Sequence, residues 1–401
     1  MIGAGAAGLA AARTLGAEGV RVTIFEARSH AGGRASTDRS LGCPADLGAA
    51  WLHFAHDNPF SGIARKAGFT IDEREPDWGP RGRIAGKRPT EQEALGWDAA
   101  TKRYYAAIAR AAEAGRDVPL TAVLPQDEFR TRFDAVMTWA VGADSSEIST
   151  VDLENYADGG PNWAVREGLG TVVAHEATSL GELVTFRYDA RVTQVDWSGA
   201  GVIVRTESGE WRGDAVIITI PTAALARDTV RFAPPLPATH RDAIEALPLG
   251  VVNKVFFRID DALMPEEPLF TVGSATTTRT AHYQLRPAGQ PLALAFFGGE
   301  FSRELERRGE LEAFAREELA SIFGREFIAG IRGTLATAWH ADPFAGGSYS
   351  VARPGQASQR HVLAEPVSPR LLFAGEACSK THYGTLVGAW ESGVAAARRL
   401  L

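Results

Sequence analysis

The chain opens on a glycine-rich turn that strongly restricts the fold it can adopt. Gly3, Gly5 and Gly8 follow the spacing G-x-G-x-x-G, which joins a buried strand to a helix in βαβ units that bind dinucleotides. The first glycine makes the tight turn, the second lets the backbone approach a pyrophosphate, and the third lets helix and strand pack closely. We therefore expect a helix to begin directly after the turn, with its free N–H groups directed at phosphate.

The residues after this turn supply the rest of such a unit. Helix-favouring residues run to Leu15, and Gly19 is placed to end that helix. Residues 20–27 (VRVTIFEA) alternate as a strand does, and Glu26 lies near the end, where an acid can accept hydrogen bonds from an adenosine ribose. A glycine pattern alone is weak evidence, but turn, helix, strand and terminal acid together predict a dinucleotide site.

Only Met1 and Ile2 precede the turn, where a βαβ unit needs a central strand. Two explanations are open. Either the start of the chain has been assigned too late, or the chain is short and its sheet has a gap that weakens cofactor retention. We expect the first.

Length and composition limit the classes of protein to which the chain can belong. With 401 residues, 45% of them apolar and 23% charged, it is long for one domain, and two globular domains are expected. A net charge of −7 without a basic run argues against nucleic acid as the partner. The sequence has no apolar stretch of about 20 residues, so no membrane-spanning helix is expected. The two cysteines, Cys43 and Cys378, are too few for a disulfide scaffold, so a cytoplasmic location is expected.

Patterns along the rest of the chain divide it into mixed blocks. Residues 91–144 carry apolar side chains at three- and four-residue spacing, which predicts helices, whereas 183–220 alternates and predicts strands. Further strands are expected at 248–260 and 291–299, and a closing helix from Leu386. This mixture suggests a discontinuous dinucleotide domain with a second domain inserted between its pieces. We place the dinucleotide domain at 1–75, 165–235 and 335–401, and a substrate domain with a helical insert at 76–164 and 236–334.

Several further segments occur together in an order typical of one enzyme family. The chain carries DLGAAWLH (46–53), PLGVVNKV (248–255), DPFAGGSYS (342–350) and LLFAGEACSKTHYGTLVGA (371–389). With this ordered set it resembles the flavin-dependent amine oxidases, which include monoamine oxidases, polyamine oxidases and lysine-specific histone demethylases. The resemblance implies an α/β fold of the amine-oxidase/PHBH-like kind. Its parts are a discontinuous Rossmann-like FAD-binding domain and an α+β substrate-binding domain.

The resemblance also implies an FAD site assembled from both ends of the chain. The opening turn and Arg34 suit the pyrophosphate, Glu26 suits the ribose, and Val192 passes the adenine. Residues 48–51 run beside the isoalloxazine ring, where small residues permit close approach. The residues implied in FAD binding are Gly3, Gly5, Ala6, Ala7, Gly8, Glu26, Ala27, Arg28, Gly33, Arg34, Gly48, Ala49, Ala50, Trp51, Val192, Pro221, Trp339, Tyr349, Gly375, Glu376, Thr385, Leu386, Val387 and Ala389.

Lys254 lies in an otherwise apolar strand pattern, and two predictions for it compete. On pattern alone it is a solvated lysine on the exposed face of an alternating strand, because burying a charge is costly. The resemblance implies instead that it holds a water against flavin N5 and assists the reaction of reduced flavin with oxygen. We prefer the second prediction.

The resemblance further implies which residues surround the amine. Tyr349 is one aromatic wall in front of the flavin, and Thr385 takes the position of the second wall, which is aromatic in monoamine oxidases. Ser348 stands where those enzymes carry the cysteine bonded to FAD, and a serine cannot form that thioether, so non-covalent FAD is expected. His53 matches a histidine or acid near the substrate nitrogen in polyamine oxidases. The catalytic residues expected are Lys254, Tyr349, Thr385 and His53.

A few residues stay ambiguous from the sequence. Trp339 belongs to a family segment beside the flavin, but a buried structural tryptophan explains it equally well, and Trp163 either lines the pocket or packs. His53 and His56 have no further ligands at suitable spacing, so no metal site is expected. Cys378 is expected to be a packed core thiol.

Together with the resemblance, these residues predict oxidation of the carbon–nitrogen bond of a small amine. The amine binds neutral, hydride passes to flavin N5, and oxygen reoxidises the flavin to give hydrogen peroxide and an imine that hydrolyses. Two other flavin reactions stay open. Apolar residues lining a tunnel would favour desaturation, and a carboxylate-binding arginine would favour L-amino-acid oxidation. A non-catalytic flavin-binding protein is the alternative from another class. The sequence predicts neither the amine nor the oligomeric state.

Overall fold

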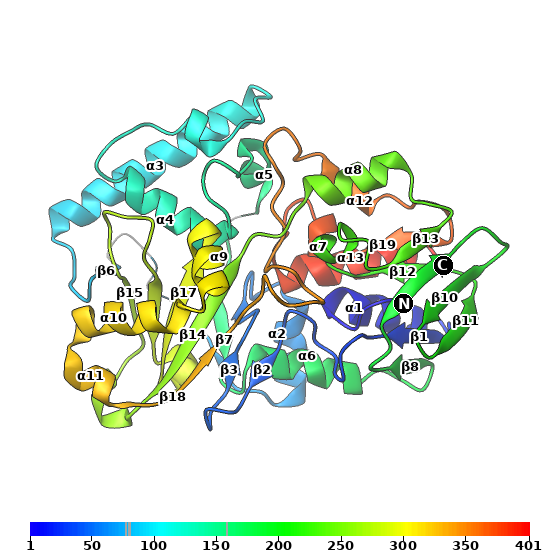
Figure 1. Ribbon diagram of the computed structural model, residues 1–401, viewed down its shortest axis with the longest axis horizontal. Helices are drawn as coiled ribbons and strands as arrows, with labels where there is room; N and C mark the ends of the chain where they lie inside the picture. The colour runs from blue at the N-terminus through cyan, green and yellow to red at the C-terminus, as the bar shows by residue number, and fades with distance from the viewer. Residues whose placement is uncertain (77, 79–81, 158) are drawn as a thin grey trace.

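The computed structural model describes residues 1–401 except 77, 79–81 and 158, and it is a mixed α/β protein (Figure 1). Figure 1 shows parallel strands and both chain termini at the right, a larger sheet at the lower left, and a group of helices at the upper left. The mixed helix and strand blocks expected from the sequence are confirmed at this level. The proposed domain boundaries stay a prediction.

The region with both termini is built on parallel strands. β1 (Val22–Phe25) pairs with β8 (Val184–Arg187), and β12 (Val216–Ile218) pairs with β19 (Leu371–Phe373). Ile2 forms parallel bridges to the last residue of β1 and to the last residue of β12, so this one residue joins the two strand pairs. All residues of β12 and β19 are buried, as expected of parallel strands covered on both faces.

Helices cover this parallel arrangement. α1 (Ala6–Ala17) follows the glycine turn as predicted, and Gly19 takes a left-handed φ of 80° just beyond its end. The predicted closing helix, α13 (Leu386–Arg398), packs along α1 so closely that a Cβ on Gly393 would lie 2.1 Å from the carbonyl oxygen of Ala7. The other elements of this region are β2 (Thr37–Asp38), β3 (Ala45–Asp46), β4 (Trp51–Leu52), β5 (Ile71–Asp72), β7 (Trp163–Val165), α2 (Pro59–Ala67) and α6 (Leu169–Thr178).

A four-stranded sheet in the order β11–β10–β9–β13 extends the same region. Together with β8 and β12, three of its strands confirm the strands predicted within 183–220. Val195 and Val204 of this sheet share a core with Phe25 and Phe373 of the parallel strands, so the two sheets are packed together. The strands are β9 (Val192–Asp196), β10 (Val202–Thr206), β11 (Gly209–Gly213) and β13 (Arg231–Ala233), and the nearby helices are α7 (Thr222–Leu225), α8 (Ala238–Ala246) and α12 (Gln359–Ala364).

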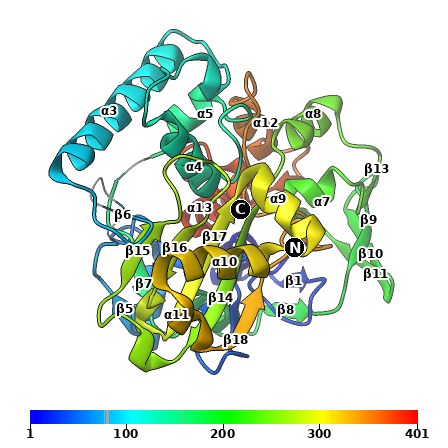
Figure 2. The same cartoon turned by 60° about the vertical axis from the view of Figure 1, so that its left-hand side comes forward.

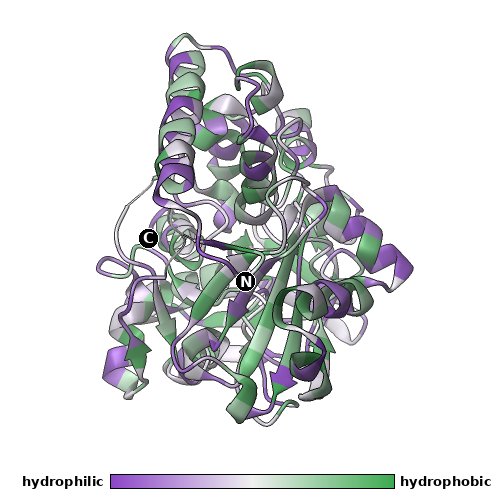
Figure 3. Cartoon of the chain, turned by 90° about the vertical axis from the view of Figure 1, so that its left-hand side faces the viewer, coloured by the Kyte–Doolittle hydropathy of each residue, from purple (hydrophilic) through white to green (hydrophobic). Residues whose placement is uncertain are grey.

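The larger sheet has six strands in the order β18–β14–β17–β16–β15–β6. Helices α9 (Gly299–Arg308), α10 (Leu311–Phe323) and α11 (Arg325–Ala329) lie against it (Figure 2), and side chains of α9 and α10 share its buried core. Figure 3 shows its strands as mainly hydrophobic. The strands are β6 (Arg83–Ile84), β14 (Val252–Ile259), β15 (Leu269–Val272), β16 (His282–Leu285), β17 (Leu292–Gly298) and β18 (Ile331–Ala336); β14 and β17 confirm the strands predicted at 248–260 and 291–299.

The helical group consists of α3 (Glu91–Glu113), α4 (Arg130–Val141) and α5 (Thr150–Asn155). α3 begins where Thr90 and Glu93 cap each other reciprocally, which satisfies backbone N–H groups that a helix start leaves unpaired. The helices predicted within 91–144 are confirmed. In the part of the chain that the structure describes, no helix combines the length and apolarity needed to cross a membrane.

Candidate active site

A large cavity is lined by residues of the parallel region, the six-stranded sheet and the helical group. Its volume is about 1200 Å³, above the range of about 300–1,000 Å³ common for small-ligand pockets. Every residue that the sequence analysis assigns to FAD binding or catalysis lines this cavity, apart from Gly8 and Val387, which are buried behind its wall. The fold therefore brings residues from both ends and the middle of the sequence to one place.

The opening turn lines part of the cavity. Gly3 has a φ of 105°, which favours glycine, and a Cβ on it would lie 2.5 Å from Thr219 Oγ1. A Cβ on Gly8 would lie 2.1 Å from the carbonyl oxygen of Gly3, so a larger residue would push α1 off the turn. No described side chain caps the start of α1, and its first N–H groups are available to an anion in the cavity.

Glu26 lies just after β1 and lines the cavity beside the turn. Its carboxylate accepts hydrogen bonds from the backbone N–H groups of Ala4 (2.8 Å) and Arg28 (2.9 Å), which fix its position. Each carboxylate oxygen can accept more than one hydrogen bond, so Glu26 can still accept ligand hydroxyl groups. This is the arrangement expected of an acid that binds a ribose.

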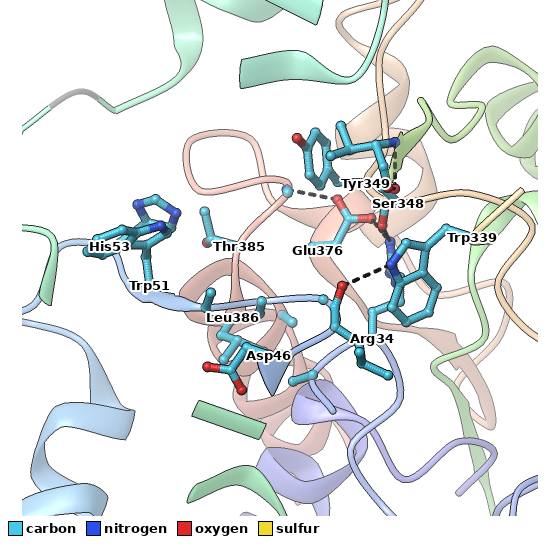
Figure 4. Close-up of a pocket in the computed structure, with 18 of the residues that line it drawn as sticks. Arg34, Asp46, Trp51, His53, Trp339, Ser348, Tyr349, Glu376, Thr385 and Leu386 are labelled. Carbon is cyan, nitrogen blue, oxygen red and sulfur yellow. Dashed lines mark hydrogen bonds and ion pairs between the residues drawn. The ribbon is translucent and has the colours of Figure 1, made fainter. Parts of the chain in front are cut away.

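Glu376 lines another part of the cavity wall, where its carboxylate binds several neighbouring residues (Figure 4). Its carboxylate accepts hydrogen bonds from Arg34 Nη1 (2.8 Å), Ser350 Oγ (2.6 Å) and the N–H of Gly384 (2.8 Å). Burial acts to raise its pKa, but the charges of Arg34 and Arg360 and the hydrogen bond from Ser350 together outweigh burial, so the pKa of Glu376 is below its usual value. Arg34 also donates to the carbonyl of Ser348 at 2.6 Å. Arg34 therefore uses its Nη1 group for contacts within the protein.

Lys254 is 5% exposed, so the prediction of a solvated lysine on the strand surface is wrong. β14 lies inside the six-stranded sheet, between β17 and β18, and residues 252–257 are all buried. The Lys254 Nζ donates to the carbonyl oxygens of Asp46 (2.8 Å) and Gly48 (2.6 Å). Burial lowers the pKa of Lys254 to about 8, against an opposing effect of the Asp46 carboxylate. An ammonium has three N–H donors, so one is left for a ligand in the cavity.

Tyr349 and Ser348 lie next to each other on the cavity wall (Figure 4). Tyr349 donates its hydroxyl proton to the backbone carbonyl of Trp139 at 2.7 Å, and burial raises its pKa, so the phenol stays neutral. The Ser348 hydroxyl donates to the carbonyl of Val252 and accepts from the same residue's N–H, both at 2.8 Å. Backbone contacts thus hold both side chains in place.

Trp51, His53 and Thr385 line another side of the cavity (Figure 4). Thr385 directly precedes α13 and accepts a hydrogen bond from the N–H of Gly388 at 3.1 Å, so its hydroxyl caps the helix. His53 Nδ1 lies 2.6 Å from Asn162 Oδ1. Burial lowers the pKa of His53, and the contact with Asn162 opposes this only in part, so His53 is neutral near pH 7.

The structure places the residues that the sequence left ambiguous. Trp339 is buried yet lines the cavity, and its indole N–H donates to the carbonyl of Leu47 at 3.1 Å. Trp163 is outside the cavity lining and packs in the core against Arg65. Cys378 is a free, partly buried thiol packed against the core of the parallel region, and burial raises its pKa to about 12. The prediction of a packed thiol is confirmed.

Several residues that line this cavity were not predicted from the sequence, including Trp97, Arg132, Trp139, Asn162, His282 and Tyr383. A usable signal existed for one of them. Arg132, Val136 and Ala140 recur at four-residue spacing on α4, and all three line the cavity. An arginine on an otherwise apolar helix face could therefore have predicted that this face lines the cavity.

The groups around the cavity fit a flavin dinucleotide. Backbone N–H groups of α1 suit phosphate, and Glu26 suits sugar hydroxyls. Gly48 lines the cavity without a side chain, so the wall here is backbone, which lets a flat ring approach closely. Packing against Arg34 requires a glycine here, because a Cβ would lie 1.7 Å from the Arg34 carbonyl oxygen. Within the described residues, no group of three histidine, cysteine or acidic side chains could hold a metal ion.

A family model described as flavin containing amine oxidoreductase matches residues 6–401. The chain belongs to this family. The resemblance drawn from the sequence motifs is thereby confirmed, and the protein is an amine oxidoreductase whose family implies a flavin cofactor.

Relatives of this amine oxidoreductase include plant enzymes. Polyamine oxidase 4 of Oryza sativa subsp. japonica is 30% identical over 439 residues, which cover 99% of this chain and 87% of the relative. Probable polyamine oxidase 4 of Arabidopsis thaliana is 30% identical over 433 residues, or 99% and 86% of the two chains. Lysine-specific histone demethylase 1 homolog 2 of Arabidopsis thaliana is 27% identical over 436 residues, which cover this whole chain and 58% of the relative.

Proposed function

We propose that this amine oxidoreductase binds FAD without a covalent bond and oxidises the carbon–nitrogen bond of a small amine, with dioxygen as electron acceptor. The observation that supports this best is the buried Lys254, whose Nζ contacts the carbonyl of Gly48 at 2.6 Å in the cavity wall. A buried amine with a lowered pKa is costly for folding, and such groups cluster at functional sites.

The proposed FAD site uses a Rossmann-like arrangement of the opening residues. The turn and α1 bind the pyrophosphate, Glu26 binds the ribose, and the ring lies beside residues 48–51. Ser348, which has no thiol, supports non-covalent binding. A flavin bound here would supply the electron sink: it would accept a hydride equivalent from the amine carbon and pass two electrons, with two protons, to dioxygen to give hydrogen peroxide.

In the proposed reaction, the residues of the protein bind, orient and deprotonate the amine. Tyr349 offers a fixed aromatic face, and the short side chain of Thr385 leaves room across the site. The neutral His53 can accept a proton from an ammonium that enters the cavity. Because amine and imidazole must both be unprotonated, the rate at which an amine reduces the flavin is expected to rise with pH.

Gly8→Ala is expected to remove most bound flavin, whereas Gly16→Ala leaves it in place. Both glycines lie in α1, but a Cβ on Gly16 would meet its nearest neighbour at an ordinary 3.5 Å, whereas one on Gly8 would overlap the Gly3 carbonyl. Overpacking costs about 1–3 kcal/mol, so flavin affinity should fall about 10-fold or more. Flavin absorbance per chain after desalting measures this, and full occupancy in both variants would contradict the assigned role of the turn.

Tyr349→Ala is expected to lower kcat/KM for the preferred amine about 100-fold, because the aromatic wall that orients the substrate is lost. Tyr349→Phe keeps the ring and loses only the hydrogen bond to the Trp139 carbonyl, so an effect below about 10-fold is expected. Steady-state peroxide release compares the two. Equal losses in both variants would assign the effect to the hydroxyl rather than to the ring.

One experiment tests the whole proposal against its alternatives. The purified protein is mixed anaerobically with a panel of amines, α-amino acids and isoprenoids, and flavin absorbance is followed before air is admitted. We expect bleaching by an amine, then recovery of colour with release of hydrogen peroxide. Bleaching by an isoprenoid would indicate desaturation, bleaching by α-amino acids alone would indicate an amino-acid oxidase, and no bleaching would indicate a non-catalytic flavoprotein.

The names of the relatives offer two candidate amines, polyamines and the side chains of lysine residues. The expectation of a small-molecule substrate and of no nucleic-acid partner, based on the net charge of −7, stays part of the proposal. The same holds for the cytoplasmic location, for which the free state of both cysteines is the only support.

A further inference from the structure

The part of the cavity between α3 and α4 contains a buried cation that has no anionic partner among the residues that the structure describes. Arg132 of α4 is 7% exposed and lines the cavity. Its guanidinium forms no hydrogen bond or ion pair with any residue that the structure describes, and its Nε is fully enclosed without an acceptor. Burial lowers the pKa of Arg132 to about 10, and no described carboxylate opposes this effect. The group is still charged at neutral pH.

The neighbours of Arg132 do not supply the missing negative charge. Its guanidinium lies over the indole ring of Trp97 in α3, 4.1 Å from the ring centre, which compensates a charge only weakly. The carboxylates nearest to the two in sequence have other partners: Asp98 pairs with Lys102, and Asp134 pairs with Arg130. A buried arginine of this kind is expensive until a ligand supplies an anion.

We propose that Arg132 binds a carboxylate at the end of the substrate remote from the reacting amine, so that the substrate is an amine with a distant carboxylate. This rests on the proposed function for the amine end. A planar guanidinium pairs with a carboxylate through two parallel N–H···O bonds, which fixes the orientation of the ligand as well as its position.

The helix geometry gives the separation between the two ends. Arg132 and Trp139 are seven residues apart on α4, about 10 Å along the helix axis. The Trp139 carbonyl holds the hydroxyl of Tyr349, beside which the amine is proposed to react. Val136 and Ala140 line the cavity on the same helix, so the chain between the two ends is expected to be aliphatic.

This separation favours an amine with a distant carboxylate over two other classes of substrate, α-amino acids and polyamines. An α-amino acid carries its carboxylate next to the amine and cannot reach Arg132 while it reacts. A polyamine would place a second ammonium near a buried guanidinium, and like charges repel strongly where water is excluded. The selectivity proposed here therefore differs from the one suggested by the names of the relatives.

Binding can be tested without catalysis. Octanoate, which has no amine, is titrated into the holoprotein and followed by calorimetry. In Arg132→Gln we expect affinity to fall at least about 10-fold, because a charge-assisted pair is lost, whereas Arg132→Lys keeps part of the binding. Arg110→Gln removes the same charge from the exposed face of α3 and should bind octanoate as the unmodified protein does. Equal octanoate affinity in Arg132→Gln and the unmodified protein would overturn the proposal.

Selectivity gives a second, independent test on the unmodified protein. We expect kcat/KM to rank ω-aminooctanoate above octylamine, and octylamine above the α,ω-diamine of the same length, with Arg132→Gln reducing the first and leaving octylamine within about threefold. A preference for the diamine would overturn the carboxylate subsite while leaving amine oxidation intact. If no amine bleaches the flavin, the proposed function fails, and octanoate binding still decides the role of Arg132.

Discussion

Lys254→Met is expected to slow reoxidation of the reduced flavin by oxygen about 10²–10³-fold while FAD stays bound. The Lys254 Nζ donates to the carbonyls of Asp46 and Gly48 in the cavity wall, which leaves one N–H and the positive charge for the ligand side. Reduction of dioxygen places negative charge on oxygen, and an ammonium stabilises this charge strongly where water is excluded. Stopped-flow mixing of anaerobically reduced enzyme with oxygenated buffer measures the rate.

The pH dependence of this step should identify the same residue. Because the pKa of Lys254 is lowered to about 8, the amine loses its charge as the pH rises through that value. Reoxidation by the unmodified enzyme is therefore expected to be fast below about pH 8 and to slow above it, a step that Lys254→Met lacks. Lys66→Met, at an exposed lysine near the end of α2, is the matched control. Equal rates in Lys254→Met and the unmodified enzyme would remove Lys254 from the mechanism.

Arg360→Met is expected to lower the free energy of unfolding by about 3–5 kcal/mol. Arg360 in α12 and Asp152 in α5 form a buried two-bond ion pair, with Nε–Oδ1 at 2.6 Å and Nη2–Oδ2 at 2.8 Å. Arg360 also donates to Ser350 Oγ at 2.7 Å, and this hydroxyl donates to Glu376. Without Arg360 the Asp152 carboxylate is buried and unpaired. Denaturant unfolding of the flavin-free protein measures the loss.

Two further variants separate this effect from a general loss of ion pairs. Arg308→Met removes the exposed partner of Glu304, 2.9 Å away, and should cost less than about 1 kcal/mol. The double variant Arg360→Met with Asp152→Leu should regain part of the stability, because no buried charge is left alone. A cost for Arg360→Met no larger than that of Arg308→Met would show that the pair does not stabilise the fold.

The opening part of the site could be predicted from sequence because its geometry is local. Gly3 and Gly8 sit in one turn, Glu26 lies at the end of the next strand, and backbone chemistry alone ties these positions together. The helices within 91–144 were equally accessible, since their apolar spacing and the cap at Thr90 lie within the segment itself.

The other parts of the site depend on contacts between segments that are far apart in the sequence, and a local sequence pattern cannot predict such contacts. Lys254 is buried because the segment around Asp46 and Gly48 covers its side of β14, and a pattern along one strand cannot show that both faces of the sheet are covered. Arg360 and Asp152 lie 208 positions apart, and Glu376 accepts a hydrogen bond from Arg34, 342 positions away. Arg132 shows the same limit. Its place on an apolar helix face could be read from the sequence, but its lack of an anionic partner within the described part of the chain follows only from how α3 and α4 pack.

The bridges formed by Ile2 have a consequence for how firmly the cofactor end is held. Ile2 joins β1 to β12, and the next residue, Gly3, donates from its N–H to the carbonyl of Phe25 at 2.8 Å. Local opening of a sheet starts where the fewest bonds must break. Here the link is the short segment Met1–Gly3, which bonds to Phe25 on one side and to Ile217 and Thr219 on the other. A dinucleotide bound at the turn would add its own binding free energy to this link, so amide hydrogens around Ile2 and Thr219 should exchange with solvent far more slowly in loaded protein than in empty protein.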